Sequence, residues 1–370
     1  MKILHLSRNF IPCVGGTEKY IAELSRRLVQ RGLDSRVLVL NYDIFDKRRK
    51  FPGHEWIEGT EVFRVPGLGH YKKPVPLGLP LRLFRWADIV HIHDLRLFYE
   101  TTLFLKPFFR YKTCLSTHGF LLHTNELKVL KTALTRLYYR PTFKRGLNAV
   151  ICDSRQDYDY FRPWGIARLF LIENGIDLAK FHSIGPDPVP GRLLYFGRID
   201  HNKGLDLMLR ALGTIKGIDW DLRIVGSGQP AFEDKLKSLA QESGIVQKIS
   251  WLGFLPEDAL RGELARAHLC LLPSRYEGFG FTLLEAMASG LVCLANTIPT
   301  YRSIIRDGEN GFLADFSRPQ ECGRTIREVL GRPLEALPPV RSKARGKASE
   351  YDWEKKVDEV IQVYRGEDHD

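Results

Sequence analysis

Long apolar runs and closely spaced cysteines are both missing from this chain. No window approaches the about 18 uninterrupted apolar residues that a membrane-spanning helix requires. The first residues, Met-Lys-Ile-Leu-His-Leu-Ser-Arg, reach charge and polarity too early for a signal peptide. The six cysteines stand far apart without a C-x-x-C pair, which disfavours disulfides and a zinc site. We therefore expect a cytosolic protein with reduced cysteines in its core.

The length and the charge narrow the class further. A chain of 370 residues exceeds what one hydrophobic core organises, so two domains are expected. The formal net charge of +11 suggests a nucleic acid, an anionic membrane or a polyphosphate substrate as partner. The charge is uneven, because residues 101–150 hold nine Lys or Arg against Glu126 alone.

The two halves of the chain open with the same order of elements: an apolar strand, a glycine-containing loop and an amphipathic helix. The first set covers residues 2–30 and the second covers residues 192–212. Strands are predicted at 2–6, 36–40, 88–93, 113–117, 149–152, 192–196, 221–225, 249–252, 269–272 and 292–295. Strands that alternate with helices predict two Rossmann-like, doubly wound α/β domains with parallel sheets.

Three segments define the expected domain organisation. The linker is residues 185–191, where three prolines exclude a helix or a central strand. We therefore expect one domain over residues 1–184 and a second over residues 185–350. Residues 351–370 carry a helical apolar stripe, which we expect to pack on the first domain.

Several polar and glycine motifs fall where strands are predicted to lead into helices, which is where open α/β sheets bind ligands. Gly15 and Gly16 precede the first helix, so they suit either phosphate binding or a structural turn. Gly197 opens a loop in which Arg198 and Lys203 could clamp one diphosphate; the alternative is two solvated cations.

Two carboxylates follow in the segment from Glu277 to Glu285. If a helix starts near Gly280, Glu285 lies inside it and Glu277 stays in the loop before it. The two can then accept hydrogen bonds from hydroxyls at different ends of one ligand. The rival chemistry is glycoside hydrolysis, but its paired carboxylates must flank the same bond.

Two further motifs are weaker. His91 and His93 share one face of a predicted strand and Asp94 follows, so a metal site is conceivable, but a structural role is favoured. The Gly226-Ser-Gly228 sequence lacks the third glycine and the ribose-binding acid of a dinucleotide site, so it is interpreted as a turn.

The order of these motifs resembles the retaining, nucleotide-sugar-dependent glycosyltransferases of family four, which have the GT-B fold. The matching pieces include Gly-Gly-Thr-Glu, Ser-Thr-His-Gly, Glu-Asn-Gly-Ile-Asp, Tyr-Phe-Gly-Arg-Ile-Asp-His-Asn-Lys-Gly and Pro-Ser-Arg-Tyr-Glu-Gly-Phe-Gly-Phe-Thr-Leu-Leu-Glu. The resemblance spans essentially the whole chain. It implies two domains that face each other across a cleft, with the acceptor on the first and the donor on the second, and a C-terminal helix that crosses back to the first domain.

The resemblance also implies roles for individual residues. The catalytic set is Arg198 and Lys203 on the donor diphosphate, with His118 and Glu277 beside the transferred sugar. The donor-binding set is Gly15, Gly16, Gly197, Gly278, Phe279, Gly280, Glu285, Leu252 and Phe254. Fixed cations would stabilise the charge that grows on the departing diphosphate, so neither a metal nor a cofactor is expected. The expected substrate is a nucleoside diphosphate sugar with uridine, guanosine or adenosine as its base.

The basic stretch suggests where the acceptor comes from. As one helix, residues 126–140 would have an apolar side and a basic side. The apolar side would hold Leu127, Leu130, Leu134, Leu137 and Tyr138, and the opposite side Lys128, Lys131, Arg136 and Arg140. This pattern fits a packed helix with a solvated face, or a cationic surface that docks on anionic lipid. We expect a glycan or lipid-linked acceptor in cell-surface polysaccharide or glycolipid synthesis, at the inner face of the cytoplasmic membrane.

Three rival classes remain at this point. An epimerase with a similar two-domain fold would release a changed nucleotide sugar, whereas a transferase releases free nucleoside diphosphate. A nucleic-acid-binding protein would show steep salt dependence, but no recognition helix or stacking motif is present, so nucleic acid is not an expected partner. A catalytically silent sugar-binding homologue is disfavoured by Arg198, Lys203, Glu277 and Glu285.

Overall fold

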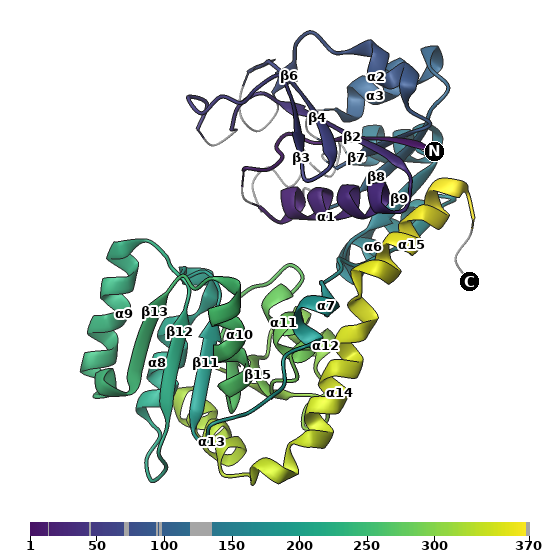
Figure 1. The fold of residues 1–370 in the computed structure, drawn as a ribbon. Coiled ribbons are helices and arrows are strands. Elements are labelled where there is room, and N and C mark those ends of the chain that lie inside the picture. Colours follow the sequence, from purple (N-terminus) through teal and green to yellow (C-terminus); the bar gives the residue numbers. More distant parts are fainter. Residues whose placement is uncertain are drawn as a thin grey trace. The chain divides into compact units, whose positions relative to one another are not determined.

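The computed structural model describes residues 1–13, 15–43, 46–69, 74–93, 95, 98–118 and 135–367. The chain forms two compact units (Figure 1): unit 1 is Met1–Asn174 with Glu354–Asp370, and unit 2 is Gly175–Trp353. The division therefore falls at residue 174, and not at the predicted residue 184. The reason is that Phe181 and Ile184 pack in the core of unit 2.

Unit 1 is built on an eight-stranded sheet with the order β10-β9-β8-β7-β1-β2-β4-β3. Its neighbouring strands run parallel except for β3, which runs antiparallel to β4 at one edge. The strands are β1 (Lys2–Leu6), β2 (Asp34–Leu40), β3 (His54–Ile57), β4 (Thr60–Val65), β7 (Ile89–Ile92), β8 (Lys112–Ser116), β9 (Ala149–Cys152) and β10 (Leu169–Leu171). A separate small sheet pairs β5 (Gly67–Leu68) with β6 (Val75–Pro76). The five predicted strands of this half are confirmed, whereas β3, β4 and β10 were not predicted.

The described helices of unit 1 begin with α1, which starts at Gly16 and buries Tyr20, Ile21, Leu24 and Leu28 on one face. They are α1 (Gly16–Gln30), α2 (Leu81–Trp86), α3 (Tyr99–Leu105), α5 (Arg140–Gly146), α6 (Arg155–Phe161) and α15 (Trp353–Arg365). Shorter turns are the 3-10 helices η1 (Lys106–Phe108) and η4 (Arg162–Trp164) and the π-helical turn η3 (Thr135–Tyr139).

Helix α15 returns to unit 1, as predicted. Val357, Val360 and Tyr364 of its apolar stripe are buried. The buried guanidinium of Arg27 in α1 lies 3.0 Å from Glu354, and Arg31, the C-cap residue after α1, lies 2.9 Å from Asp358. The C-terminal helix is therefore attached to α1 by apolar packing and by ion pairs.

Unit 2 is built on a six-stranded, all-parallel sheet with the order β13-β12-β11-β14-β15-β16. Its strands are β11 (Arg192–Phe196), β12 (Asp221–Val225), β13 (Ile249–Gly253), β14 (Leu269–Leu272), β15 (Cys293–Asn296) and β16 (Phe312–Ala314). Its helices are α7 (Leu178–His182), α8 (Leu205–Gly213), α9 (Pro230–Glu242), α10 (Glu257–Arg266), α11 (Phe281–Ala288), α12 (Pro299–Ile304), α13 (Pro319–Leu330) and α14 (Pro338–Ala348). Short 3-10 turns are η5 (His201–Lys203), η6 (Val246–Lys248), η7 (Leu334–Ala336) and η8 (Ser349–Tyr351).

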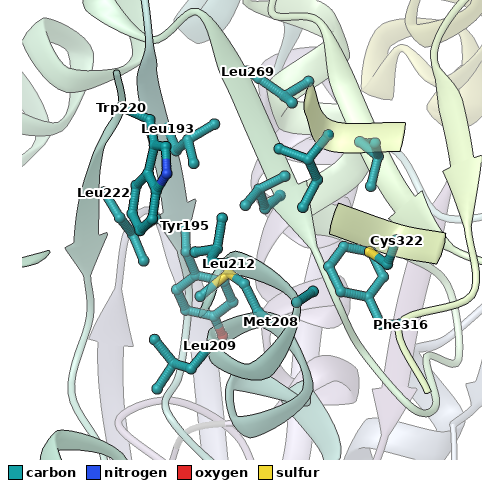
Figure 2. Close-up of a cluster of buried hydrophobic side chains, with 14 of the residues drawn as sticks. Leu193, Tyr195, Met208, Leu209, Leu212, Trp220, Leu222, Leu269, Phe316 and Cys322 are labelled. Atoms are coloured by element: carbon teal, nitrogen blue, oxygen red, sulfur yellow. The ribbon is translucent and has the colours of Figure 1, made fainter. Parts of the chain in front are cut away.

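The sheet of unit 2 has an apolar cluster on each face. Leu193 and Tyr195 of β11 belong to one cluster, and the alternate residues Leu194 and Phe196 belong to the other. This is the period of two that a strand buried on both faces requires. Figure 2 shows Tyr195 beside Met208 and the other apolar side chains of α8. The core thus fixes β11 and α8, and the loop between them contains Arg198 and Lys203.

All six cysteines are buried with free thiols, as the sequence predicted. Burial is the largest cause that raises the pKa of Cys13 to about 11 and that of Cys322 to about 12. Within the described ranges, no helix has both the length and the apolar character that a bilayer crossing needs.

Candidate functional site

The predicted motifs of unit 2 meet at one edge of its sheet. β11 ends at Phe196 and leads into the loop with Arg198 and Lys203, and β14 ends at Leu272 and leads into the loop with Glu277. The two strands are neighbours in the sheet. Because carboxyl ends of parallel strands share one edge, the two loops lie side by side.

The central contact of this site is an ion pair between the loops. The Lys203 ammonium lies 2.6 Å from Oε1 of Glu277, and both side chains are mostly buried. Ser274 donates to the same oxygen at 2.7 Å, and the Tyr301 hydroxyl donates to it at 3.3 Å. Burial, followed by the neighbouring Glu277, raises the pKa of Tyr301 well above its usual value, so its hydroxyl keeps the proton that it donates. The second oxygen, Oε2, makes no hydrogen bond to any residue that the structure describes.

Arg275 joins the two loops through a different set of bonds. Its guanidinium binds both oxygens of Asp206 in α8, at 2.8 and 2.7 Å, and donates to the carbonyl of His201 at 2.8 Å. Its backbone amide donates to the carbonyl of Asn202 at 2.7 Å. The sequence prediction missed this residue, although it stands two positions before Glu277 inside the motif.

The predicted residues from Gly278 to Glu285 lead from the loop after β14 into α11. α11 begins at Phe281, one residue after Gly280, so Glu285 lies in the helix and Glu277 in the loop, as predicted. The ring of Phe279 packs on Phe281, with centroids 4.7 Å apart. Backbone amides of the glycine-flanked segment thus lead directly into the N-terminus of α11.

The other three predicted donor residues lie in or directly after two strands: Gly197 follows β11, Leu252 lies in β13, and Phe254 follows β13. Gly197 directly follows β11 with a φ of 137°, a conformation that favours glycine. Leu252 is partly buried in β13, whereas the Phe254 side chain is exposed. Arg198 is also exposed, at 82%, with its guanidinium 3.7 Å from Asp200.

The glycine turn after β12 has a structural role, as predicted. A Cβ atom on Gly226 would collide with the carbonyl oxygen of Gly197, and one on Gly228 would collide with that of Ile199. The amide of Ile199 also donates to Ser227 at 3.0 Å. The turn therefore supports the loop that holds Arg198.

In unit 1 the predicted residues lie at the start of α1 and directly after β8. Gly15 is the N-cap of α1, and a Cβ on Gly16 would meet no described atom within 4 Å. His118 follows β8 with a φ of 43°, which is unusual for a residue with a side chain. Its imidazole is only 7% exposed.

Comparison with known proteins agrees with this arrangement. Residues 180–365 match the family model of glycosyl transferases group 1, and residues 14–180 match that of glycosyltransferase family 4. The chain belongs to the glycosyl transferases group 1 family. It is therefore a glycosyltransferase, and the predicted GT-B class of two Rossmann-like domains is confirmed.

The similar curated proteins include mannosyltransferases. The GDP-mannose:cellobiosyl-diphosphopolyprenol alpha-mannosyltransferase of Komagataeibacter xylinus is 28% identical, over 99% of this chain and 93% of that protein. Its namesake from Xanthomonas campestris is 28% identical, over 98% and 96%.

Solved structures share the fold at lower identity. Sucrose-phosphate synthase from Thermosynechococcus elongatus superposes with a TM-score of 0.73 at 19% identity, and the match covers 99% of this chain and 98% of that one. HepE of Anabaena in complex with UDP has a TM-score of 0.74 at 19% identity, with 99% and 100% covered.

Three buried histidines of unit 1, His5, His91 and His93, form a cluster next to His118. Ring nitrogens of His5, His91 and His93 lie within 4.8 Å of one another. However, Nδ1 of His5 and Nε2 of His93 are 2.9 Å apart and hydrogen-bonded, which is closer than the about 3.3 Å between two ligands of a tetrahedral zinc ion. His91 is bound to Tyr364 at 2.6 Å and to Ser116 at 2.8 Å. Each of these histidines is thus hydrogen-bonded to protein groups, which suits the favoured structural role, whereas Nε2 of His5 has no partner among the described residues. Asp94 lies outside the described residues.

The described part of the basic stretch, residues 135–140, departs from the regular α-helix predicted over residues 126–140. Lys128 and Lys131 lie outside the described residues, whereas Arg136 and Arg140 are exposed. Leu137, which was expected on the apolar side away from Arg136, is 81% exposed next to it. The reason is the π-helical turn Thr135–Tyr139, whose wider i→i+5 spacing shifts each side chain from its α-helical position.

The buried histidines predict a pH-dependent stability of unit 1. Burial lowers the pKa of His5 to about 3 in the folded protein, from 6.5 when the chain is unfolded. Below pH 6.5 the unfolded chain therefore binds a proton that the folded protein does not bind. The contribution of His5 to the free energy of unfolding is thus complete above pH 6.5 and is lost as the pH falls. The loss is about 1.4 kcal/mol for each pH unit.

We expect His5→Phe to lose this part of the pH dependence. The measurement is hydrogen exchange of the β1 and β7 amides, which reports the opening free energy of unit 1, at pH 7.5 and pH 5.5. Between these values the variant should lose about 1.4 kcal/mol less than the parent protein. Equal losses in both proteins would contradict the assignment.

Proposed function

We propose that this protein transfers mannose from GDP-mannose to a saccharide carried on a lipid diphosphate, with retention of the anomeric configuration and without a divalent metal. The observation that carries the proposal is the pair of Lys203 and Glu277, positioned by two neighbouring strands and followed directly by the N-terminus of α11. The names of the two mannosyltransferases that match nearly the whole chain support the sugar, the base and the acceptor.

In this proposal the donor binds to both loops of unit 2. Lys203 and the exposed Arg198 hold the diphosphate, together with the amides of Gly278, Phe279 and Gly280. Oε2 of Glu277 accepts a sugar hydroxyl, because Oε1 is already occupied by three donors. Glu285 accepts the ribose hydroxyls.

The other donor contacts follow the same scheme. Leu252 and Phe254 border the base, and Gly197 leaves room for the diphosphate beside β11. From unit 1, Gly15 and Gly16 approach the diphosphate, and His118 lies beside the sugar.

The chemistry follows from where charge develops. As the bond between the sugar and the diphosphate breaks, negative charge grows on the phosphate oxygens, and Lys203, Arg198 and helix-terminal amides stabilise it more than they stabilise the bound donor. These groups supply the positive charge that a metal supplies elsewhere. Since Glu277 is held by Lys203, Ser274 and Tyr301, it is better suited to bind a hydroxyl than to attack the sugar. The acceptor then attacks from the face that the diphosphate leaves, with a phosphate oxygen as the base.

The acceptor side of the proposal places the protein at an anionic membrane. Phe104 and Phe108, at the end of α3 and in η1, are 72% and 71% exposed. α3 packs on the basic segment through Tyr99, whose hydroxyl donates to Thr142 of α5 at 2.8 Å. Exposed Leu137 and Arg136 belong to that segment. Exposed apolar and cationic side chains on two packed elements suit a bilayer with acidic headgroups.

Replacing Lys203 by Ala should lower turnover at least about a hundredfold, because a charged contact to the departing diphosphate is lost. The same is expected for Arg198→Ala. The measurement is release of free GDP from GDP-mannose in the presence of a polyprenyl diphosphate saccharide, repeated with EDTA, which should not lower the rate.

The matched control is Lys237→Ala, which removes a surface lysine of α9 from the same unit. Its turnover should stay close to that of the parent protein. Unchanged turnover in Lys203→Ala would contradict the diphosphate assignment. A changed nucleotide sugar without free GDP would indicate an epimerase, and binding without either product would indicate a silent homologue.

Replacing Lys128, Lys131, Arg136 and Arg140 together by Gln should weaken binding to vesicles that contain phosphatidylglycerol, because each basic residue near an anionic surface contributes about 1 kcal/mol. Sedimentation with vesicles measures this, and GDP affinity should stay the same. The control removes the same charge from unit 2, at Arg210, Lys235, Arg324 and Lys343. Equal vesicle binding by the two variants would defeat the membrane proposal.

A further inference from the structure

Four acidic or imidazole side chains form one line along the carboxyl edge of the sheet in unit 1. Asp153 follows β9, His118 follows β8, His93 follows β7, and His5 lies near the end of β1. These strands are adjacent in the order β9-β8-β7-β1. The side chains therefore succeed one another in space in the order of the strands.

Consecutive members of the line are within hydrogen-bonding distance. Oδ2 of Asp153 lies 3.3 Å from Nδ1 of His118. Nε2 of His118 lies 2.9 Å from Nδ1 of His93, and Nε2 of His93 lies 2.9 Å from Nδ1 of His5. Nε2 of His5, where the line ends, has no partner among the described residues.

The charge of Asp153 sets the direction of the first bond in the line. Burial opposes its ionisation, but the hydrogen bond from His118 and the electrostatic attraction to it, followed by the hydrogen bond from Thr117, outweigh burial and lower the pKa of Asp153. An ionised carboxylate only accepts, so Nδ1 of His118 carries a proton and donates to Asp153. One carboxylate thereby fixes the orientation of the His118 ring, and His93 holds the ring at its other nitrogen.

We propose that Asp153 and His93 are positioning residues that fix the ring of His118, with its Nδ1–H directed at Asp153. The inference rests on the proposed function, in which His118 lies beside the transferred sugar. A sugar that loses its diphosphate becomes positively charged, like the oxocarbenium ion of glycoside hydrolysis. The carboxylate behind the ring favours that charge, and a ring held at both nitrogens keeps one orientation toward the sugar.

The surroundings of the line support this role. The Asp153 carboxylate is joined to a second acid through Thr117, whose hydroxyl lies 3.2 Å from Asp153 and 2.5 Å from Asp157. The Tyr20 ring packs edge-on against His118, with centroids 4.8 Å apart. Burial, and then the neighbouring histidines, lower the pKa of His93 well below its usual value, so that it stays neutral.

His91 offers a matched control outside the line. It lies on the same strand as His93, is equally buried and makes two hydrogen bonds, but these go to Tyr364 and Ser116. A variant of His91 therefore loses similar packing and hydrogen bonding without breaking the line.

The experiment compares Asp153→Asn with His91→Phe in the full chain. We expect Asp153→Asn to lower kcat for mannose transfer at least about tenfold, because a misplaced group beside the reacting centre is costly. KM for GDP-mannose should stay within about threefold, and His91→Phe should keep most of the activity of the parent protein. If kcat of Asp153→Asn stays within about twofold of the parent, the proposal is overturned.

A nitrogen-15 spectrum of the histidine side chains tests the line independently of activity. The parent protein should show His118 with a proton on Nδ1, and Asp153→Asn should lose this preference. An unprotonated Nδ1 of His118 in the parent protein would overturn the inference. If the protein transfers no mannose, the proposed function fails, but this spectrum still decides whether the line exists.

Two variants of His93 cover the case in which Asp153→Asn does not fold. The amide nitrogen of Asn stands close to the place of Nδ1 in histidine, so His93→Asn keeps a donor for His118 and His93→Leu removes it. We expect His93→Asn to retain a kcat at least about fivefold above that of His93→Leu. Equal kcat values would contradict the positioning role.

Discussion

The site depends on one constraint, which is that parallel strands end at a common edge of their sheet. In unit 2 this edge brings the loop after β11 against the loop after β14, and the ion pair of Lys203 and Glu277 joins them. Arg275 holds the same two loops from the side of α8 through Asp206. Contacts within the protein thus hold the side chains of Lys203 and Glu277 in place. Under the proposed function, little reorganisation would then oppose the departure of a diphosphate.

The same constraint operates in unit 1 with different chemistry. Here the edge aligns one carboxylate and three imidazoles, and no lysine or arginine takes part in the line. Under the proposed function, positive charge on unit 2 suits a departing anion, and rings backed by a carboxylate on unit 1 suit an emerging sugar cation. The two units therefore repeat one architecture with different charge.

The sequence predicted most of the fold because buried parallel strands leave short apolar runs, as Leu269–Leu272 does in β14. It missed the edge strand β3, whose side chains alternate between exposed and partly buried, and with it the buried strand β4 to which β3 pairs. Lys203 was predicted from the glycine-bounded loop after β11, and Glu277 and Glu285 were predicted from a second, denser motif. Arg275 stands in the same motif but bonds to Asp206, which is distant in the sequence. The histidine line was not predictable at all, because its members come from four strands and only the strand order brings them together. The boundary at residue 174 was missed for a related reason, since Phe181 and Ile184 read as ordinary apolar residues on either side of a linker.

A crystal structure with GDP-mannose, or with GDP and mannose, tests the central claim most directly. The account predicts that the Lys203 ammonium lies within hydrogen-bonding distance of a β-phosphate oxygen and that Oε2 of Glu277 accepts a mannose hydroxyl. A diphosphate bound elsewhere, with Lys203 still paired only to Glu277, would contradict it.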